Sequence, residues 1–304
     1  MERRGFIKRL GLGAAAVSAA STLSLPAFAK GKVAAAPFKL DFAPHFGMFK
    51  QHAPGGLVDE LRFMADQGFR SLEDNGLLKR PLAEQELIGK TLDQLGMRMG
   101  VFVVDGGDNW KVSLTTGKQE FLDNFVATCK ASVEAAKRVN AKWMTVVPGY
   151  FERNLPIGVQ TGHVIDALKR GAEIFEPQGL AMVLEPLSDN PDLFLRHADQ
   201  TYMICRAVGS PACKLLYDAY HMQRNEGNLI ATMEKTWSEI AYIQIGDNPG
   251  RKEPGTGEIN YANVFQFIHK KGFTGILGME HGNALPGKEG ELALIEAYRK
   301  VDVK

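Results

Sequence analysis

The feature that most constrains the fold is a unit that recurs from residue 38 onward. An amphipathic segment ends in glycine or asparagine, and a short apolar run follows almost at once. A left-handed glycine or asparagine at the end of a helix lets the chain turn into a strand. The apolar runs are therefore predicted strands, near residues 38–43, 69–73, 98–104, 142–147, 180–185, 213–218, 241–245 and 274–279.

The segments between the runs have the periodicity of helices. Leu61 and Met64 share one face of the first, and we expect Leu292, Ile295 and Tyr298 to pack the last one inward. Eight strand–helix units in about 270 residues are typical of the (β/α)₈ TIM barrel. An open doubly wound sheet would need a glycine-rich phosphate loop after an early strand, and the sequence has none.

The N-terminus has the pattern of a twin-arginine export signal. Arg3 and Arg4 precede a Gly/Ala-rich stretch, and an A-x-A-like cleavage site ends at Ala29. The alternative is a membrane-anchoring helix, but the apolar stretch is short and weakly hydrophobic. We therefore expect residues 1–29 to be removed and residues 30–304 to form one barrel domain. Export by the twin-arginine machinery would make the protein periplasmic, and a non-functional signal would leave it cytoplasmic.

Charge and cysteine content exclude some classes of protein. Lys and Arg number 36 and Asp and Glu 35, so the formal net charge of +1 does not favour a nucleic-acid partner. A barrel-shaped DNA-repair endonuclease would need a histidine-rich cluster of metals, and seven histidines do not suggest one. Cys129, Cys205 and Cys213 lack metal-ligand spacing and are predicted core residues.

Polar side chains stand at the ends of the four late strands. Glu185, Asp218 and Glu280 directly follow apolar runs, and Gln244 lies within the seventh. Barrel enzymes carry their chemistry at this end of the strands. Carboxylate and amide oxygens suit Mg²⁺ or Mn²⁺, and a buried amide without a partner would cost about 1–3 kcal/mol. The pattern predicts one divalent metal ion bound by these four residues.

Three further residues follow the predicted ligands closely. His221 lies three residues after Asp218 and is predicted to orient a ligand or to contact the substrate. Arg251, in the loop after the seventh strand, can bind a carboxylate or hydroxyl groups with its planar guanidinium. Glu258 is predicted to contact the substrate, to pair with Arg251 or to cap the next helix.

The early strands contribute candidates to the same mouth. His45 and Glu73 end the first and second strands, so both face it if the chain forms a barrel. Trp110, in the long loop after the third strand, either covers a sugar carbon chain or packs the loop. His45 and Trp110 are predicted to contact the substrate.

Several of these segments resemble hydroxypyruvate isomerases, which belong to the xylose-isomerase-like group of sugar isomerases and epimerases. The resemblance implies the same four metal ligands, with Glu185 and Glu280 as an acid/base pair, and substrate contacts at His221 and Arg251. Epimerases of this group usually carry histidine as the strand-seven ligand, so Gln244 indicates the isomerase branch. The segments are residues 184–187, 217–223, 243–251, 253–261 and 279–280.

The expected chemistry is isomerisation through an enediolate. One glutamate removes a proton beside a carbonyl and the other returns it, in an order that the sequence leaves open. Hydroxypyruvate would give tartronate semialdehyde, with Arg251 holding the carboxylate, and a related sugar or sugar acid could react in the same way. The export signal leaves open an epimerase or a lyase of 3-keto-glycosides. A non-catalytic sugar-binding protein is a further alternative, and a homo-oligomer is compatible with the sequence.

We predict that export depends on both arginines of the signal. A reporter fused after Ala29 should leave the cytoplasm, and the pair Arg3→Lys with Arg4→Lys should retain it there, as fractionation would show. Normal export of the doubly substituted signal would contradict the twin-arginine interpretation.

Overall fold

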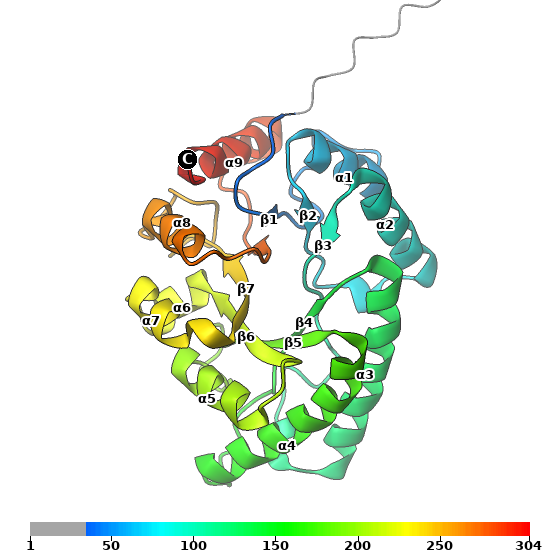
Figure 1. Cartoon of the computed structure of the whole chain (residues 1–304), viewed down its shortest axis with the longest axis vertical. Helices are drawn as coiled ribbons and strands as arrows, with labels where there is room; N and C mark the ends of the chain where they lie inside the picture. Colours follow the sequence, from blue (N-terminus) through cyan, green and yellow to red (C-terminus); the bar gives the residue numbers. More distant parts are fainter. Residues whose placement is uncertain (1–34) are drawn as a thin grey trace, which may run out of the picture. The chain divides into compact units, whose positions relative to one another are not determined.

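The computed structural model describes residues 35–304, so the predicted export signal lies outside the described residues. Within that part, strands and helices alternate along the chain (Figure 1). The strands of the described part are β1 (Phe42–Ala43), β2 (Ser71–Leu72), β3 (Arg98–Met99), β4 (Trp143–Val146), β5 (Ala181–Leu184), β6 (Cys213–Asp218), β7 (Ile240–Ile245) and β8 (Leu277–Met279).

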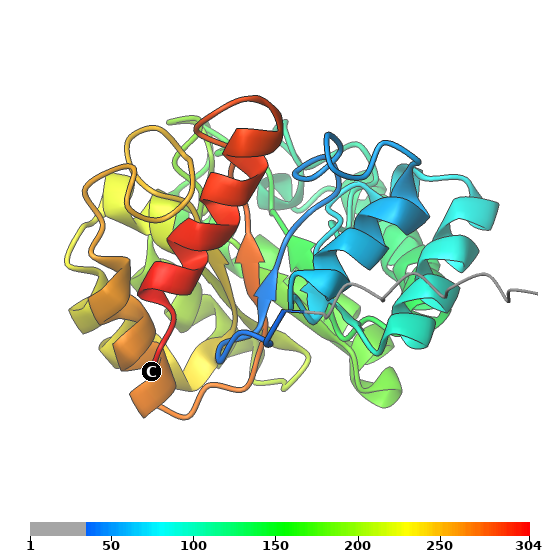
Figure 2. The same cartoon turned by 90° about the horizontal axis from the view of Figure 1, so that it is seen from above.

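The strands form a closed parallel ring. Six of them make one sheet in the order β1-β8-β7-β6-β5-β4, and β2 pairs with β3. Single parallel bridges, between His45 and Glu73 and between Val103 and Thr145, join this pair to both ends of the sheet. Figure 1 shows the strands in the centre with the helices around them, and Figure 2 shows β1 and β8 side by side and parallel. The predicted TIM barrel is confirmed. The first three strands are shorter than predicted, and beyond their ends these single bridges continue the pairing.

At least one helix follows each strand, as predicted. The α-helices of the described part are α1 (Leu57–Asp66), α2 (Leu82–Leu95), α3 (Gln119–Val139), α4 (Ile157–Phe175), α5 (Ala198–Val208), α6 (Ala219–Asn225), α7 (Leu229–Thr236), α8 (Tyr261–Lys270) and α9 (Gly287–Val301). Gly96 and Asn140 end α2 and α3 with φ of 63° and 52°, the left-handed conformation expected from the sequence. Among residues 35–304, no helix has the length and apolar content to cross a bilayer.

The helices bury their apolar faces against the ring. Leu61, Met64, Ile295 and Tyr298 are buried, as predicted, and so are the three cysteines. Leu292, however, is 47 % exposed, which contradicts its predicted inward packing. The inward face of α9 consists of residues 290, 291, 294, 295 and 298, a helical stripe that includes one charged residue, Glu291.

Two buried carboxylates hold the loop after β1. Glu60 on α1 accepts the backbone N–H groups of Gly47 and Phe49 at 2.7 and 2.9 Å. Glu291 on α9 accepts the N–H of Gln51 at 2.7 Å and that of the next residue at 2.9 Å. These bonds explain why a charged residue occupies the inward stripe of α9, because its carboxylate satisfies backbone donors that would otherwise be unpaired.

We predict that Glu291→Ala lowers the free energy of unfolding by about 1–3 kcal/mol, because buried N–H groups lose their acceptor. Urea unfolding of the mature chain would measure the loss. Glu296→Ala, at an exposed position of the same helix, is the matched control and should change stability by less than about 0.5 kcal/mol. Equal stability of the two variants would show that Glu291 does not anchor the loop.

Candidate metal centre and active site

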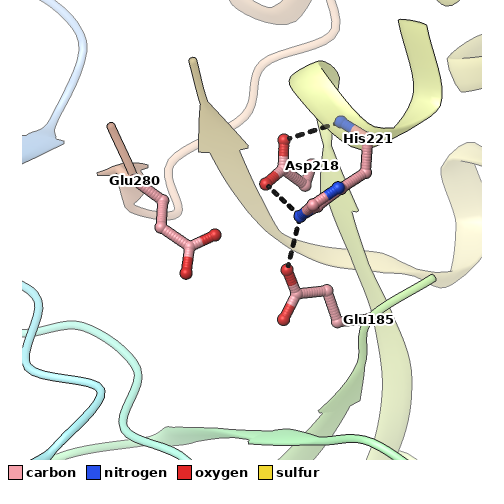
Figure 3. Close-up of side chains that lie close together, drawn as sticks. All are labelled: Glu185, Asp218, His221 and Glu280. Carbon is pink, nitrogen blue, oxygen red and sulfur yellow. Dashed lines mark hydrogen bonds and ion pairs between the residues drawn. The ribbon is translucent and has the colours of Figure 1, made fainter. Parts of the chain in front are cut away.

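Three predicted metal ligands converge at the carboxyl ends of their strands. Glu185 follows β5, Asp218 ends β6 and Glu280 follows β8. With His221 on α6, they each offer a ligand atom, and these atoms all lie within 4.8 Å of one another. Figure 3 shows the three carboxylates directed toward a common space, with the imidazole between Asp218 and Glu185. This cluster of carboxylates and one histidine can hold a metal ion.

The fourth predicted ligand, Gln244, lies at the level of this cluster. On β7 it pairs with Asp218 of β6 on one side and with Gly278 of β8 on the other. Its side chain is fully buried, and its amide nitrogen donates to Glu73 at 2.8 Å. The structure therefore brings all four predicted ligands to one end of the ring.

The donor atoms fit a cation. Oε1 of Glu185, Oδ2 of Asp218 and Oε1 of Gln244 are buried and accept no hydrogen bond within the described part of the chain. Buried polar atoms without partners are costly, so three of them from three neighbouring strands call for an electropositive ligand. A divalent metal ion would satisfy all three at once, in the all-oxygen environment that Mg²⁺ and Mn²⁺ favour.

Electrostatics point the same way. Burial raises the pKa of Glu185 well above its usual range, and Glu280 and Asp218 raise it further. Burial also raises the pKa of Glu280, although Arg251 opposes the shift. The pKa of Glu73 rises to about 7, chiefly through burial. Several carboxylates in a dry space cannot all hold negative charge unless a cation compensates them.

His221 is held in place by contacts on both ring nitrogens. Its Nδ1 lies 3.2 Å from the backbone nitrogen of Ser188 and 2.8 Å from the Ser188 hydroxyl. Its Nε2 lies 3.0 Å from Nη2 of Arg251, which can only donate a hydrogen bond. Burial lowers the pKa of His221 and keeps it neutral. Nε2 also lies 3.6 Å from Asp218 Oδ2, which places the imidazole at the edge of the carboxylate cluster.

Arg251 is a fixed cation beside the cluster. Its Nη2 donates to Glu280 Oε2 at 2.8 Å, and its guanidinium carbon lies 4.9 Å from the centre of the Tyr220 ring. Burial opposes its charge, but Glu280 and Asp218 raise the pKa of Arg251 above its usual value. Its backbone has φ of 50°, a left-handed conformation that is uncommon outside glycine and is often found at functional sites.

Asp247, which sequence reasoning missed, holds the loop that carries Arg251. Its fully buried carboxylate accepts the N–H of Gly255 at 2.8 Å, of Gly257 at 2.9 Å and of Ile259 at 3.1 Å. The sequence signal was present, since aspartate in a run rich in Gly, Asn and Pro often accepts backbone N–H groups of its own loop. The buried carboxylate of Asp247 therefore fixes the backbone of the loop in which Arg251 lies.

The remaining predicted residues differ in their placement. Glu258 is exposed and accepts from Gln223 at 3.2 Å, and Asn260, not Glu258, caps α8. Neither predicted structural role of Glu258 is seen, because its carboxylate turns along the surface of its own loop. His45 is half-buried with its Nε2 3.1 Å from the His281 carbonyl oxygen, and it lines a cavity of about 480 Å³. Trp110 is 53 % exposed, and a substrate contact there stays a prediction.

Asn75 is a site residue that the sequence did not reveal. Its Nδ2 donates to Glu280 Oε1 at 2.8 Å, while its own Oδ1 is buried without a partner in the described chain. Glu280 thus has Asn75 on one oxygen and Arg251 on the other. The only local signal was a turn-like Asp-Asn-Gly run after the second strand, which does not predict a contact with the eighth.

The family is decided by a match over most of the barrel. The model of the xylose isomerase-like TIM barrel family matches residues 61–301. The chain belongs to this family. It is 31 % identical over 194 residues to hydroxypyruvate isomerase of Escherichia coli K12, covering 62 % of this chain and 72 % of the relative. It is 27 % identical over 241 residues to 2-oxo-tetronate isomerase of Cupriavidus necator, covering 77 % and 89 %.

Solved structures support the same fold. An AP endonuclease of family 2 from Brucella melitensis superposes with a TM-score of 0.73 at 22 % identity, covering 85 % of this chain and 99 % of the other. A 3-keto-D-glucoside 4-epimerase from E. coli gives 0.71 at 19 % identity, covering 86 % and 99 %. The two relatives compared by sequence, hydroxypyruvate isomerase and 2-oxo-tetronate isomerase, are both isomerases. The predicted membership of a sugar-isomerase family of enzymes is therefore confirmed.

We predict that Asp247→Asn lowers the free energy of unfolding by about 1–3 kcal/mol, because an amide N–H₂ replaces an oxygen that faces backbone donors. Thermal and urea unfolding would measure the loss. Glu258→Gln in the same loop is the control, since its exposed side chain should change stability by less than about 0.5 kcal/mol. A fully stable Asp247→Asn would contradict the role given to this carboxylate.

Proposed function

We propose that the chain is a divalent-metal-dependent isomerase of a short 2-oxo acid, with hydroxypyruvate as the first substrate to test. The observation that carries this proposal is a pair of glutamates, Glu185 buried and Glu280 half-buried, at the two ends of a four-strand arc. Glu185 and Glu280 follow β5 and β8, while Asp218 and Gln244 lie on the two strands between them. The two carboxylates therefore approach the enclosed space from different sides (Figure 3).

The metal ligands in this proposal are Glu185, Asp218, Gln244 and Glu280. The unpartnered oxygens of the first three support the assignment. When bound, Mg²⁺ or Mn²⁺ would act as a Lewis acid that polarises the substrate carbonyl. The described metal cluster contains a single histidine, which agrees poorly with a histidine-rich multi-metal nuclease site.

The two glutamates perform the proton transfers. One carboxylate removes a proton from the hydroxyl-bearing carbon beside the carbonyl, and an enediolate forms as the electron pair moves toward the carbonyl oxygen. The other glutamate delivers a proton to the former carbonyl carbon. One C–H bond breaks and another forms, and the proton of the substrate hydroxyl passes to the former carbonyl oxygen. The carbonyl and the hydroxyl thus exchange carbons with no net gain or loss of atoms.

Arg251 and His221 supply the polar contacts to the substrate. The guanidinium of Arg251 is a permanent cation at the mouth, suited to a carboxylate. The imidazole of His221, beside Asp218 and Arg251, is placed to contact a substrate oxygen. Hydroxypyruvate and 2-oxo-tetronate, named in two relatives, are both 2-oxo acids with a hydroxyl on the next carbon. The carboxylate of such a substrate matches the cation of Arg251, and its carbonyl matches the proposed metal, which would activate it.

We propose the periplasm as the place of action, on the basis of the N-terminal sequence. The twin-arginine pattern supports export to the periplasm of a chain that folds, and takes up its metal, in the cytoplasm. An exported enzyme meets sugars outside the cytoplasm, so oxidised sugars belong beside hydroxypyruvate in a substrate screen. The same glutamates would serve an epimerase or a β-eliminating lyase.

We predict that Glu280→Gln lowers turnover by at least about 100-fold and weakens metal binding, because it removes both a base and a ligand charge. Proton NMR in D₂O would follow the reaction of the Mg²⁺-loaded mature protein, and calorimetry would follow Mn²⁺ binding. Glu296→Gln, an exposed position, is the control. Wild-type turnover of Glu280→Gln would refute the site assignment.

The same NMR experiment separates the candidate reactions. Deuterium uptake with the carbon skeleton intact supports an isomerase, or an epimerase if only configuration changes. A split product from a 3-keto-glycoside would identify a lyase. Binding of sugars without any exchange of a carbon-bound proton would identify a non-catalytic sugar-binding protein and overturn the proposal.

A further inference from the structure

A second layer of polar groups lies directly behind the proposed metal ligands. The carboxylate of Glu73, just after β2, is only 1 % exposed. Its Oε1 accepts from Gln244 Nε2 at 2.8 Å, and its Oε2 accepts from the Tyr242 hydroxyl at 2.9 Å. Gln244 and Tyr242 lie two residues apart on β7, so both side chains leave the same face of that strand. Both oxygens of Glu73 are thus committed to β7, a strand that does not pair with β2.

This contact decides which way the amide of Gln244 points. Glu73 Oε1 accepts from Nε2 of Gln244, so the end of the amide that faces Glu73 is the NH₂ group. The carbonyl oxygen must then face away from Glu73. That oxygen is the buried, unpartnered Oε1 at the register of Asp218.

The neighbouring strand leaves room for this arrangement. Gly278 on β8 pairs with Gln244, and a Cβ built on it would lie 1.8 Å from Glu73 Oε2. The same Cβ would lie 3.1 Å from Gln244 Cγ. A side chain at position 278 would therefore displace the carboxylate. Residues from β7, β8 and the end of β2 together build one pocket for the Glu73 carboxylate.

We propose that Glu73 is a positioning residue that holds Gln244 with its carbonyl oxygen presented as a metal ligand. This inference rests on the proposed metal-dependent function. By accepting the N–H of Gln244, Glu73 also polarises the amide toward its carbonyl oxygen, which strengthens that oxygen as a ligand. The alternative is that Glu73 only fills the interior of the ring.

The first test compares two substitutions of Glu73 by their affinity for Mn²⁺. Glu73→Leu cannot accept from Gln244 and should weaken Mn²⁺ binding about 10–100-fold. Glu73→Gln keeps a carbonyl oxygen for the Gln244 amide and should lose less than about tenfold. Electron paramagnetic resonance of free Mn²⁺ during titration gives the affinity independently of turnover. Equal affinity of Glu73→Leu and the wild type would overturn the inference.

A reciprocal exchange keeps the test decisive if Glu73→Leu does not fold. Gln244→Glu alone sets two carboxylates against each other and should bind Mn²⁺ at least about tenfold more weakly. Adding Glu73→Gln restores one donor and one acceptor, and should recover most of the lost affinity. Absence of recovery in a folded double variant would show that the two side chains do not act as a pair.

The failure of this inference can be distinguished from failure of the proposed function. If Glu280→Gln weakens Mn²⁺ binding but Glu73→Leu does not, only the role of Glu73 is wrong. If neither substitution changes Mn²⁺ binding, the metal site itself is wrong and the positioning role falls with it. Weakening by both, with partial rescue by Glu73→Gln, supports the two proposals together.

Discussion

Negative charge held away from water is the condition around which this end of the barrel is built. Glu185, Asp218 and Glu280 offer oxygens within 4.8 Å of one another, and burial works against the ionisation of Glu185 and Glu280. The surrounding structure supplies positive charge and donors in compensation. Arg251 and Asn75 each hold one oxygen of Glu280, and several buried oxygens remain for a cation. The loops around the mouth carry these partners, Arg251 after β7 and Asn75 after β2.

The same condition connects the site to carbon-acid chemistry. A carboxylate kept in a dry space with a raised pKa is a stronger base than one in water, and it regains its charge only beside a compensating cation. Two such carboxylates on opposite sides of one space allow a proton to leave from one carbon and arrive at another. The similarity to isomerases agrees with a site in which two basic carboxylates face one space.

The periodic features of the sequence predicted the fold and the principal site residues. Strand ends lie together in a barrel, so the adjacency of Asp218 and Gln244 on neighbouring strands could be read from their positions. Contacts across the ring could not, because nothing local links Asn75 to Glu280, 205 residues away, or Glu73 to Gln244, 171 residues away. Leu292 was wrongly predicted to face inward. The inward position next to it is taken by Glu291, a charged residue that periodicity alone does not place in a buried face.

The closure of the ring has a consequence for how the barrel can change. Continuous hydrogen-bonded pairing runs from β4 through β8 to β1, the arc on which the proposed ligands stand, whereas single bridges attach β2 and β3. The framework is thus stiffest where oxygen atoms must keep fixed spacing, and most lightly tied where the early loops border the opening. Insertions or replacements in those loops can reshape what enters the mouth while the ligand arc keeps its geometry. The barrel therefore joins a continuously paired half, which carries the proposed ligands, to a half whose strands are tied by single bridges.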